Sequence, residues 1–130
     1  MWVRSGAEAL AWRDESAQLS RVQLDRPTYE VFRNRTEFAR YLHDHVEAAV
    51  PVPPIDFERE LAVLFALGPR SSTGYEIDVE SVTEQRGRVV IVARERSPRL
   101  GQAVDAHVDY PLRLIVLRDV GKPVAFKRSG

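Results

Sequence analysis

The sequence contains no cysteine in its 130 residues, which excludes disulfide bonds, thiolate metal sites and a cysteine nucleophile. Its longest apolar run falls far short of the ~20 residues that a membrane-spanning helix needs. Basic and acidic residues balance at 19 each, so the excess of Lys and Arg that is typical of nucleic-acid-binding proteins is missing. We therefore expect no membrane span and no nucleic-acid partner.

The N-terminal sequence also lacks a visible export signal. Residues Met1 to Gly6 do not contain the apolar stretch of about 7–15 residues that defines a signal peptide. As written, the chain is expected to be cytoplasmic. If it is the processed form of a longer chain, an extracytoplasmic location is expected instead.

Length and composition predict one globular domain. With 44% hydrophobic and 29% charged residues, the chain resembles ordinary globular proteins and is long enough to bury a core. We expect a single domain over residues 1–130. Residues 1–16 are rich in Ala and Glu and are expected to form an N-terminal arm, either mobile or folded as a short helix. Trp12 would anchor this arm to the domain or the domain to a partner.

One main helix is predicted from Arg35 to Val50. Asn34 suits the N-cap position, and Glu37 follows three residues later, which is the spacing of a capping box. Pro51 prevents the helix from continuing. The apolar residues of the segment form one stripe, which predicts that the helix covers a sheet: Phe38, Leu42, Val46, Ala49 and Val50.

Several segments have the patterns of strands. Glu60 to Leu67 is almost wholly apolar, which predicts a central strand buried on both faces, whereas Tyr75 to Val82 alternates like a half-buried strand. Pro111 indicates a bulge, an edge position or a cis Tyr110–Pro111 bond. The other extended segments are Gln18–Leu24, Thr28–Arg33, Arg88–Arg96, Gln102–Asp109, Tyr110–Arg118 and Pro123–Lys127. The fold class is therefore α+β: a largely antiparallel twisted sheet or partial barrel packed by the helix Arg35 to Val50.

A hairpin accounts for the uneven distribution of charge. Residues 1–85 carry a net charge of −6 (9 basic, 15 acidic) and residues 86–130 carry +6 (10 basic, 4 acidic). A three-residue loop, Gln85 to Gly87, would pair Asp78 with Arg94 and Glu76 with Arg96 across two strands. The alternative is a polar surface for an acidic partner.

Tests for catalytic and metal-binding patterns favour a protein that is not an enzyme. His43 and His45 lie two apart on the predicted helix, so their imidazoles point away from each other and cannot share an ion. The glycine-bracketed segment 68–74 lacks the Lys-Ser/Thr pair of a phosphate-binding loop. Its hydroxyls have no neighbouring base, although a hydrolase would be possible if His107 lay beside one of them. We assign no catalytic residue, no metal site and no cofactor.

Short motifs between Asp56 and Arg118 carry a resemblance to a known family. They are Asp56-Phe57, Gly68, Ser72-Thr73-Gly74-Tyr75, Pro98-Arg99-Leu100-Gly101 and Tyr110-Pro111-Leu112. In order and spacing they resemble the C-terminal domain of the PrcB family, accessory subunits of a bacterial surface protease complex. The resemblance implies a non-catalytic domain that binds or stabilises a protein partner such as a peptidase. The three loops also resemble, more distantly, those of chagasin-type protease inhibitors, which are all-β sandwiches.

The predicted binding surface follows from these loops. A glycine turn lets the backbone approach a partner closely, and tyrosine supplies a stiff contact area with a polar tip. Its residues are Ser72, Thr73, Gly74, Tyr75, Arg99, Leu100, Gly101 and Tyr110. A structural role for Gly74 and Tyr75 is an equal alternative: a positive φ at the glycine and closure of the core by the ring. A small-molecule or carbohydrate-binding domain with a cleft between helix and sheet is the alternative function.

Overall fold

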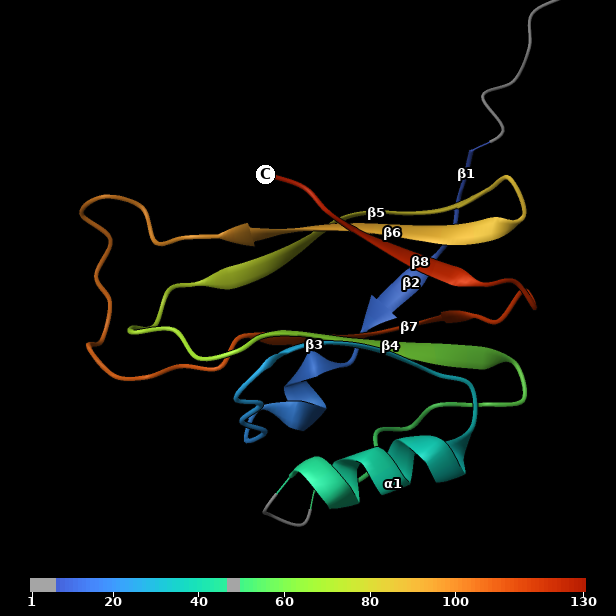
Figure 1. Ribbon diagram of the computed structural model, residues 1–130, viewed down its shortest axis with the longest axis horizontal. Coiled ribbons are helices and arrows are strands. Elements are labelled where there is room, and N and C mark those ends of the chain that lie inside the picture. Colours follow the sequence, from blue (N-terminus) through green and yellow to red (C-terminus); the bar gives the residue numbers. More distant parts are fainter. Residues whose placement is uncertain (1–6, 47–49) are drawn as a thin grey trace, which may run out of the picture.

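The structure, a computed structural model, describes residues 7–46 and 50–130 and has three layers (Figure 1). Two four-stranded sheets face each other, and the helix α1 (Arg35–His45) covers the outer face of one of them. Sheet A contains, in order, β1 (Glu8–Ala9), β5 (Glu76–Gln85), β6 (Arg88–Arg96) and β8 (Val124–Arg128). Sheet B contains β2 (Trp12–Asp14), β7 (Leu112–Arg118), β4 (Glu60–Leu67) and β3 (Pro27–Phe32).

The helix and the two sheets confirm the α+β class, with a predominance of β structure, and correct the expected sheet arrangement. Neighbouring strands are antiparallel except β6 and β8, which are parallel. The prediction of one sheet or a partial barrel was wrong, because the strands form two separate open sheets. The connection from β6 to β7 carries the chain from one sheet to the other, so these consecutive strands do not pair.

Strand β4 lies inside sheet B, between β3 and β7. Its alternate side chains Leu61, Val63 and Phe65 face sheet A and join the core between the sheets. The intervening Ala62 and Leu64 belong to the core under the helix. Because both faces are covered, polar residues are excluded and the strand is a continuous apolar run. The prediction of a central strand buried on both faces is confirmed.

Helix α1 begins as predicted and ends earlier. Asn34 has an extended backbone, and its Oδ1 accepts a hydrogen bond from the Glu37 N–H at 2.8 Å, which confirms the N-cap. The predicted end at Val50 was wrong, because the helix stops at His45 and Val46 is extended (φ −124°, ψ 121°). The β-branched side chain of Val46 is restricted at χ1 in a helix, which favours extended backbone there. Ala49 lies outside the described residues.

The β5–β6 hairpin has the predicted register. Glu76 is opposite Arg96 and Asp78 is opposite Arg94, and Arg96 forms ion pairs with both carboxylates. The turn differs, because the strands continue to the Gln85–Arg88 pair and leave two loop residues instead of three. Both have positive φ, 50° at Arg86 and 77° at Gly87, as a type I′ turn requires.

The described part of the N-terminal arm is extended. Instead of a helix, residues 8–14 form β1 and β2, which pair with β5 and β7 in different sheets. The segment Gln18–Leu24, expected to be a strand, contains the end of a 3-10 helix, η1 (Ser16–Leu19), followed by irregular backbone. Its apolar side chains are buried under sheet B without strand pairing: Leu19, Val22 and Leu24. Tertiary contacts of these side chains therefore override the local alternation.

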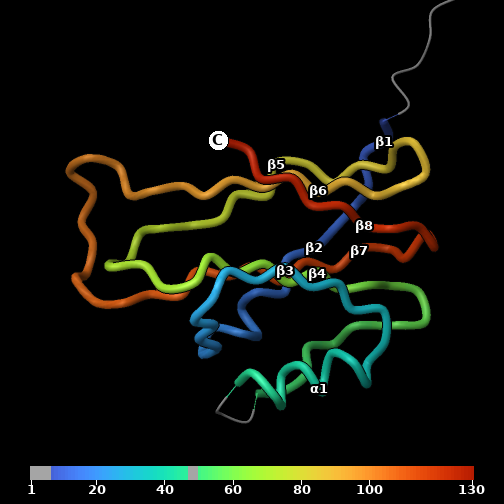
Figure 2. The backbone as a smooth tube through the Cα atoms, in the orientation of Figure 1, coloured from blue at the N-terminus to red at the C-terminus, as the bar shows by residue number. Residues whose placement is uncertain are grey.

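The two long sides of the sandwich are closed differently. On one side the chain crosses from β1 to β2 (Figure 2), and the partly buried Leu10 packs against the core between the sheets. On the opposite side the edge strands are β3 in sheet B and β8 in sheet A. A hydrogen bond from the Tyr29 hydroxyl to the Val124 carbonyl links these edges at 3.3 Å. This side therefore depends on side chains for its closure.

We predict that Asn34→Ala destabilises the protein by about 0.5–2 kcal/mol, because the first turn of α1 loses the acceptor for the Glu37 N–H. Urea unfolding of the purified protein measures this change. Asn34→Asp, which keeps a carboxylate oxygen at the cap, is the control and should retain most of the stability. Equal losses in both variants would contradict a role for the cap oxygen.

Candidate functional site

Two loops meet at one end of the sandwich. Residues 68–75 join β4 to β5, and residues 97–111 cross from β6 in sheet A to β7 in sheet B (Figure 1). Arg70 and Asp109 exchange two backbone hydrogen bonds, N–H to carbonyl, at 2.8 and 2.9 Å. The loops thus form one continuous surface, called here the loop end.

The longer loop corrects two predictions. Gln102–Asp109 is irregular backbone instead of a strand, because it bridges the two sheets and has only the isolated pairing of Asp109 with Arg70. The alternating pattern of this segment is therefore not matched by strand pairing in either sheet. No cis peptide bond occurs among the described residues, so Tyr110–Pro111 is trans and β7 begins directly after it.

Thr73 holds the two loops together, and Ser72 braces the shorter loop from within. The Thr73 N–H donates to the Asp105 carbonyl at 3.1 Å, and the Asp105 N–H donates to the Thr73 hydroxyl oxygen at 2.8 Å. The Ser72 hydroxyl donates to the Thr73 carbonyl at 3.0 Å. These hydroxyls are engaged in contacts that shape the loop end.

Gly74 has a structural reason to be glycine. Its φ is +97°, and a Cβ atom there would lie 2.9 Å from side-chain carbons of both Pro98 and Val104. Such contacts are far inside normal van der Waals distance, so a larger residue would push the two loops apart. The structural alternative predicted for Gly74 is therefore supported by its surroundings.

The other predicted residues differ in exposure. Leu100 is wholly exposed, at 106% of its reference area, and Arg99 and Gly101 beside it are also exposed. Tyr75 and Tyr110 are half-buried. The structure thus brings the predicted residues to one end of the molecule, but only the tip around Leu100 projects fully. Their role in binding stays a prediction.

Sequence reasoning missed two exposed apolar residues on the same loop. Val104 is 41% exposed and Val108 is 54% exposed. Their segment was interpreted as a strand, in which one face would have been covered. The alternating pattern of that segment gave no sign that it would lie outside a sheet.

Sequence reasoning also missed a charged cluster beside the loop end. Arg70 donates two hydrogen bonds to the Glu95 carboxylate, at 2.7 and 2.9 Å, and Arg128 donates a third at 2.7 Å. The hydrogen bonds from Arg70 lower the pKa of Glu95 below its ordinary value, and those same bonds raise the pKa of Arg70. Glu95 is opposite Ile77 in the hairpin, so local register gave no hint of this cluster.

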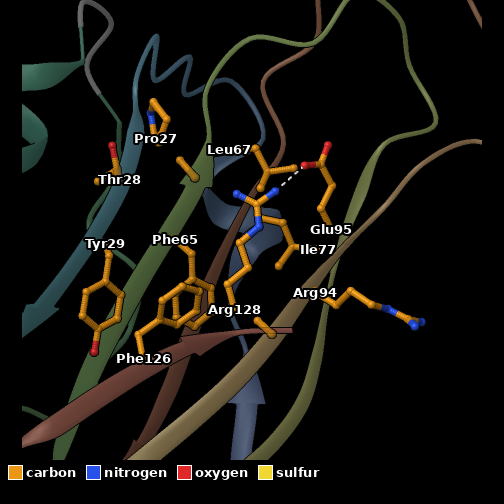
Figure 3. A pocket seen from close by; sticks show the side chains of 12 residues that line it. Pro27, Thr28, Tyr29, Phe65, Leu67, Ile77, Arg94, Glu95, Phe126 and Arg128 are labelled. Carbon is orange, nitrogen blue, oxygen red and sulfur yellow. Dashed lines mark hydrogen bonds and ion pairs between the residues drawn. The ribbon is translucent and has the colours of Figure 1, made fainter. Parts of the chain in front are cut away.

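An apolar cavity of about 210 Å³ opens between the edges β3 and β8 (Figure 3). Stacked rings of Tyr29, Phe65 and Phe126 form one side of it, with centroids 4.9–6.2 Å apart. The space under α1, where a ligand cleft was predicted, is filled by core side chains such as Phe38 and Leu42. A hollow lined by polar and aromatic residues lies at the edge of that region, beside Tyr41.

The site contains little that suggests catalysis. Among residues 7–46 and 50–130, no group of three or more His, Cys, Asp or Glu side chains is placed to hold a metal ion. In the same part of the chain, no hydrogen bond joins the His107 imidazole to a serine or threonine hydroxyl, which the hydrolase alternative requires.

Within the described residues, no helix is long and apolar enough to cross a membrane.

The fold and loop end together define a helix-covered β-sandwich domain with a candidate interaction surface at one end. Residues 61–118, from β4 through β7, match the model of the family described as PrcB C-terminal. This match confirms the resemblance predicted from the sequence motifs and includes both loops of the loop end. No curated protein and no solved structure matched the chain.

We predict that Gly74→Ala destabilises the protein more than Gly101→Ala. Both glycines have positive φ, which costs an L residue about 1–2 kcal/mol. Only at Gly74 does the new methyl group collide with neighbours, which adds about 1–3 kcal/mol; Gly101 has nothing within 4 Å. Chemical denaturation of both variants tests the difference, and equal destabilisation would show that the close contacts at Gly74 are unimportant.

We predict that Glu95→Gln reduces the acid sensitivity of the fold. Because the folded-state pKa of Glu95 is lowered, its contribution is complete above the ordinary glutamate pKa and is lost as pH falls through the lowered value. The stability gap between wild type and variant should therefore shrink as the solution is acidified. Urea unfolding midpoints across a pH series measure this difference in stability. Glu58→Gln, on an exposed turn, is the control. A constant gap at all pH values would contradict the prediction.

Proposed function

We propose that this protein is a non-catalytic protein-binding domain that serves as an accessory or stabilising subunit of a protease complex. The match of residues 61–118 to the PrcB C-terminal family supports the protease association. The observation that carries the proposal is the apolar tip of the 97–111 loop. Leu100, Val104 and Val108 are exposed there, although the burial of apolar side chains away from water is favourable. Exposed apolar groups of this kind mark interaction sites.

The loop is held in place before any partner arrives. Hydrogen bonds at Thr73–Asp105 and at Arg70–Asp109 tie it to the shorter loop at two points. A surface that is already ordered loses less conformational entropy on binding, so more of its contact energy appears as affinity. This bracing supports a binding role for the apolar tip.

The surroundings of the tip suit a protein interface. Arg99 lies next to Leu100, and the half-buried Tyr75 and Tyr110 lie in the same loops. Arginine and tyrosine are enriched among residues that dominate binding energy, while a central apolar side chain fills a pocket on the partner. The proposed partner is a peptidase, contacted through Leu100 and Val108 with these residues around them.

We expect the double variant Leu100→Ser/Val108→Ser to lose binding to such a peptidase by tenfold or more, because truncation of a central contact typically costs at least about 2 kcal/mol. The test begins with affinity capture from extract of the source organism and mass spectrometry. The affinity of any captured peptidase is then measured with purified proteins. Both side chains are more than half exposed, so the melting temperature should change little.

Trp12→Ser provides the matched control. Trp12 is also an exposed apolar residue, at 39%, but it is opposite Leu117, at the far end of β7 from the loop end. Retention of a peptidase by wild type and Trp12→Ser, with loss in the double variant, supports the proposal. Capture that is equal in all three proteins, or capture of no peptidase, refutes it.

A further inference from the structure

The cavity between β3 and β8 is distinct from the apolar tip of the loop end. Its lining comes from five strands: β3 and β4 of sheet B, and β5, β6 and β8 of sheet A. Figure 3 shows the rings of Tyr29, Phe65 and Phe126 gathered on one side. Ile77 lies across from the rings in Figure 3, and both Ile77 and Ala93 line the cavity and are almost fully buried.

The cavity exists because the sandwich is closed unequally. On one side the segment from β1 to β2 crosses between the sheets, and its Leu10 packs against the core there. On the β3–β8 side the sequence places the small Ala93 on β6, opposite Arg128 of β8. A methyl group there leaves space that a larger apolar residue would fill.

The mouth of the cavity carries excess positive charge. Arg70 and Arg128 both donate to the single carboxylate of Glu95. Phe126 and Arg128 are two residues apart on β8, so their side chains lie on the same face of the strand. The Arg128 side chain therefore lies beside the aromatic wall, and it is 59% exposed. A guanidinium has five N–H donors, so its bond to Glu95 leaves donors for an anion.

Volume limits the ligand to a small group. Apolar cavities of about 150 Å³ hold benzene, so about 210 Å³ accommodates one ring with a short substituent. Drug-sized ligands typically occupy roughly 300–1,000 Å³, so the cavity suits a smaller group. The apolar walls select an uncharged ring, and the cationic mouth selects an acidic group attached to it.

We propose that this cavity binds a single aromatic ring that carries a carboxylate, with the ring against Tyr29, Phe65 and Phe126 and the carboxylate at Arg128. Such a group is found in a free aryl-alkanoic acid and in the C-terminal residue of a peptide that ends in phenylalanine. The two sources share the same recognition chemistry. The inference is independent of the proposed protease partner, because Leu100 and Val108 do not line the cavity.

The first experiment titrates the full chain with 3-phenylpropionate over the millimolar range, followed by NMR of backbone amides. Shift changes should concentrate at Tyr29, Ile77, Ala93 and Phe126. The neutral alcohol 3-phenylpropan-1-ol should bind at least tenfold more weakly, because it cannot pair with Arg128. Shift changes scattered over the surface, or equal binding of acid and alcohol, overturn the proposal.

Three variants locate the site. Arg128→Gln should weaken the acid at least tenfold, whereas Arg94→Gln removes the same charge from a side chain that points away from the rings (Figure 3) and should change little. Ala93→Leu should abolish binding by filling the cavity. If Ala93→Leu does not fold, the comparison of Arg128→Gln with Arg94→Gln still tests whether the carboxylate binds at Arg128. Equal effects of the two arginine substitutions refute the assignment.

A short peptide ending in phenylalanine, compared with its C-terminal amide, distinguishes the sources. Binding of the acid but not of the peptide assigns the site to free small acids. Binding of the peptide that is lost on amidation assigns it to a chain terminus. If neither the acid nor the peptide binds, the proposal is wrong.

Discussion

The burial of β4 on both faces is the constraint on which the rest of the structure depends. Leu61, Val63 and Phe65 enter the core between the sheets, and Ala62 and Leu64 enter the core under α1. Each large side chain buried in this way contributes about 1.5–3 kcal/mol. A strand with two apolar faces is stable only if something covers each face, so β4 requires both the second sheet and the helix. The three layers follow from this one strand and its neighbour β7, whose side chains divide in the same way.

The elements set by local chemistry could be predicted from the sequence. The apolar run of β4, the alternation in β5, the cap at Asn34 and the charge-paired hairpin all depend on residues close in the chain or directly opposite one another. The helix end was less predictable. Val46 still contacts the core under α1 although its backbone is extended, so an apolar stripe alone did not reveal where helical backbone stops.

The parts that were not predicted depend on contacts between distant segments. The division into two sheets depends on whether β7 pairs with β6 or with β4, and the spacing of apolar residues is the same in either case. The pairing of β1 and β2, the parallel return of β8 and the Arg70–Glu95–Arg128 cluster each join residues far apart in sequence. For the candidate site, short motifs located the loops correctly. They did not show that Leu100 is exposed whereas Gly74 is closely surrounded, because exposure depends on the tertiary structure.

Arg70 physically connects the loop end to the cavity. Its backbone is paired with Asp109 of the longer loop, while its guanidinium holds Glu95 at the mouth of the cavity. The position of the loop at Asp109 and the position of the bidentate ion pair at Glu95 are therefore tied to the same residue. Because Glu95 also accepts from Arg128, a change at Arg70 alters how strongly that cation is neutralised. The two surfaces are separate in their lining residues, but Arg70 contacts both, through its backbone at Asp109 and through its guanidinium at Glu95.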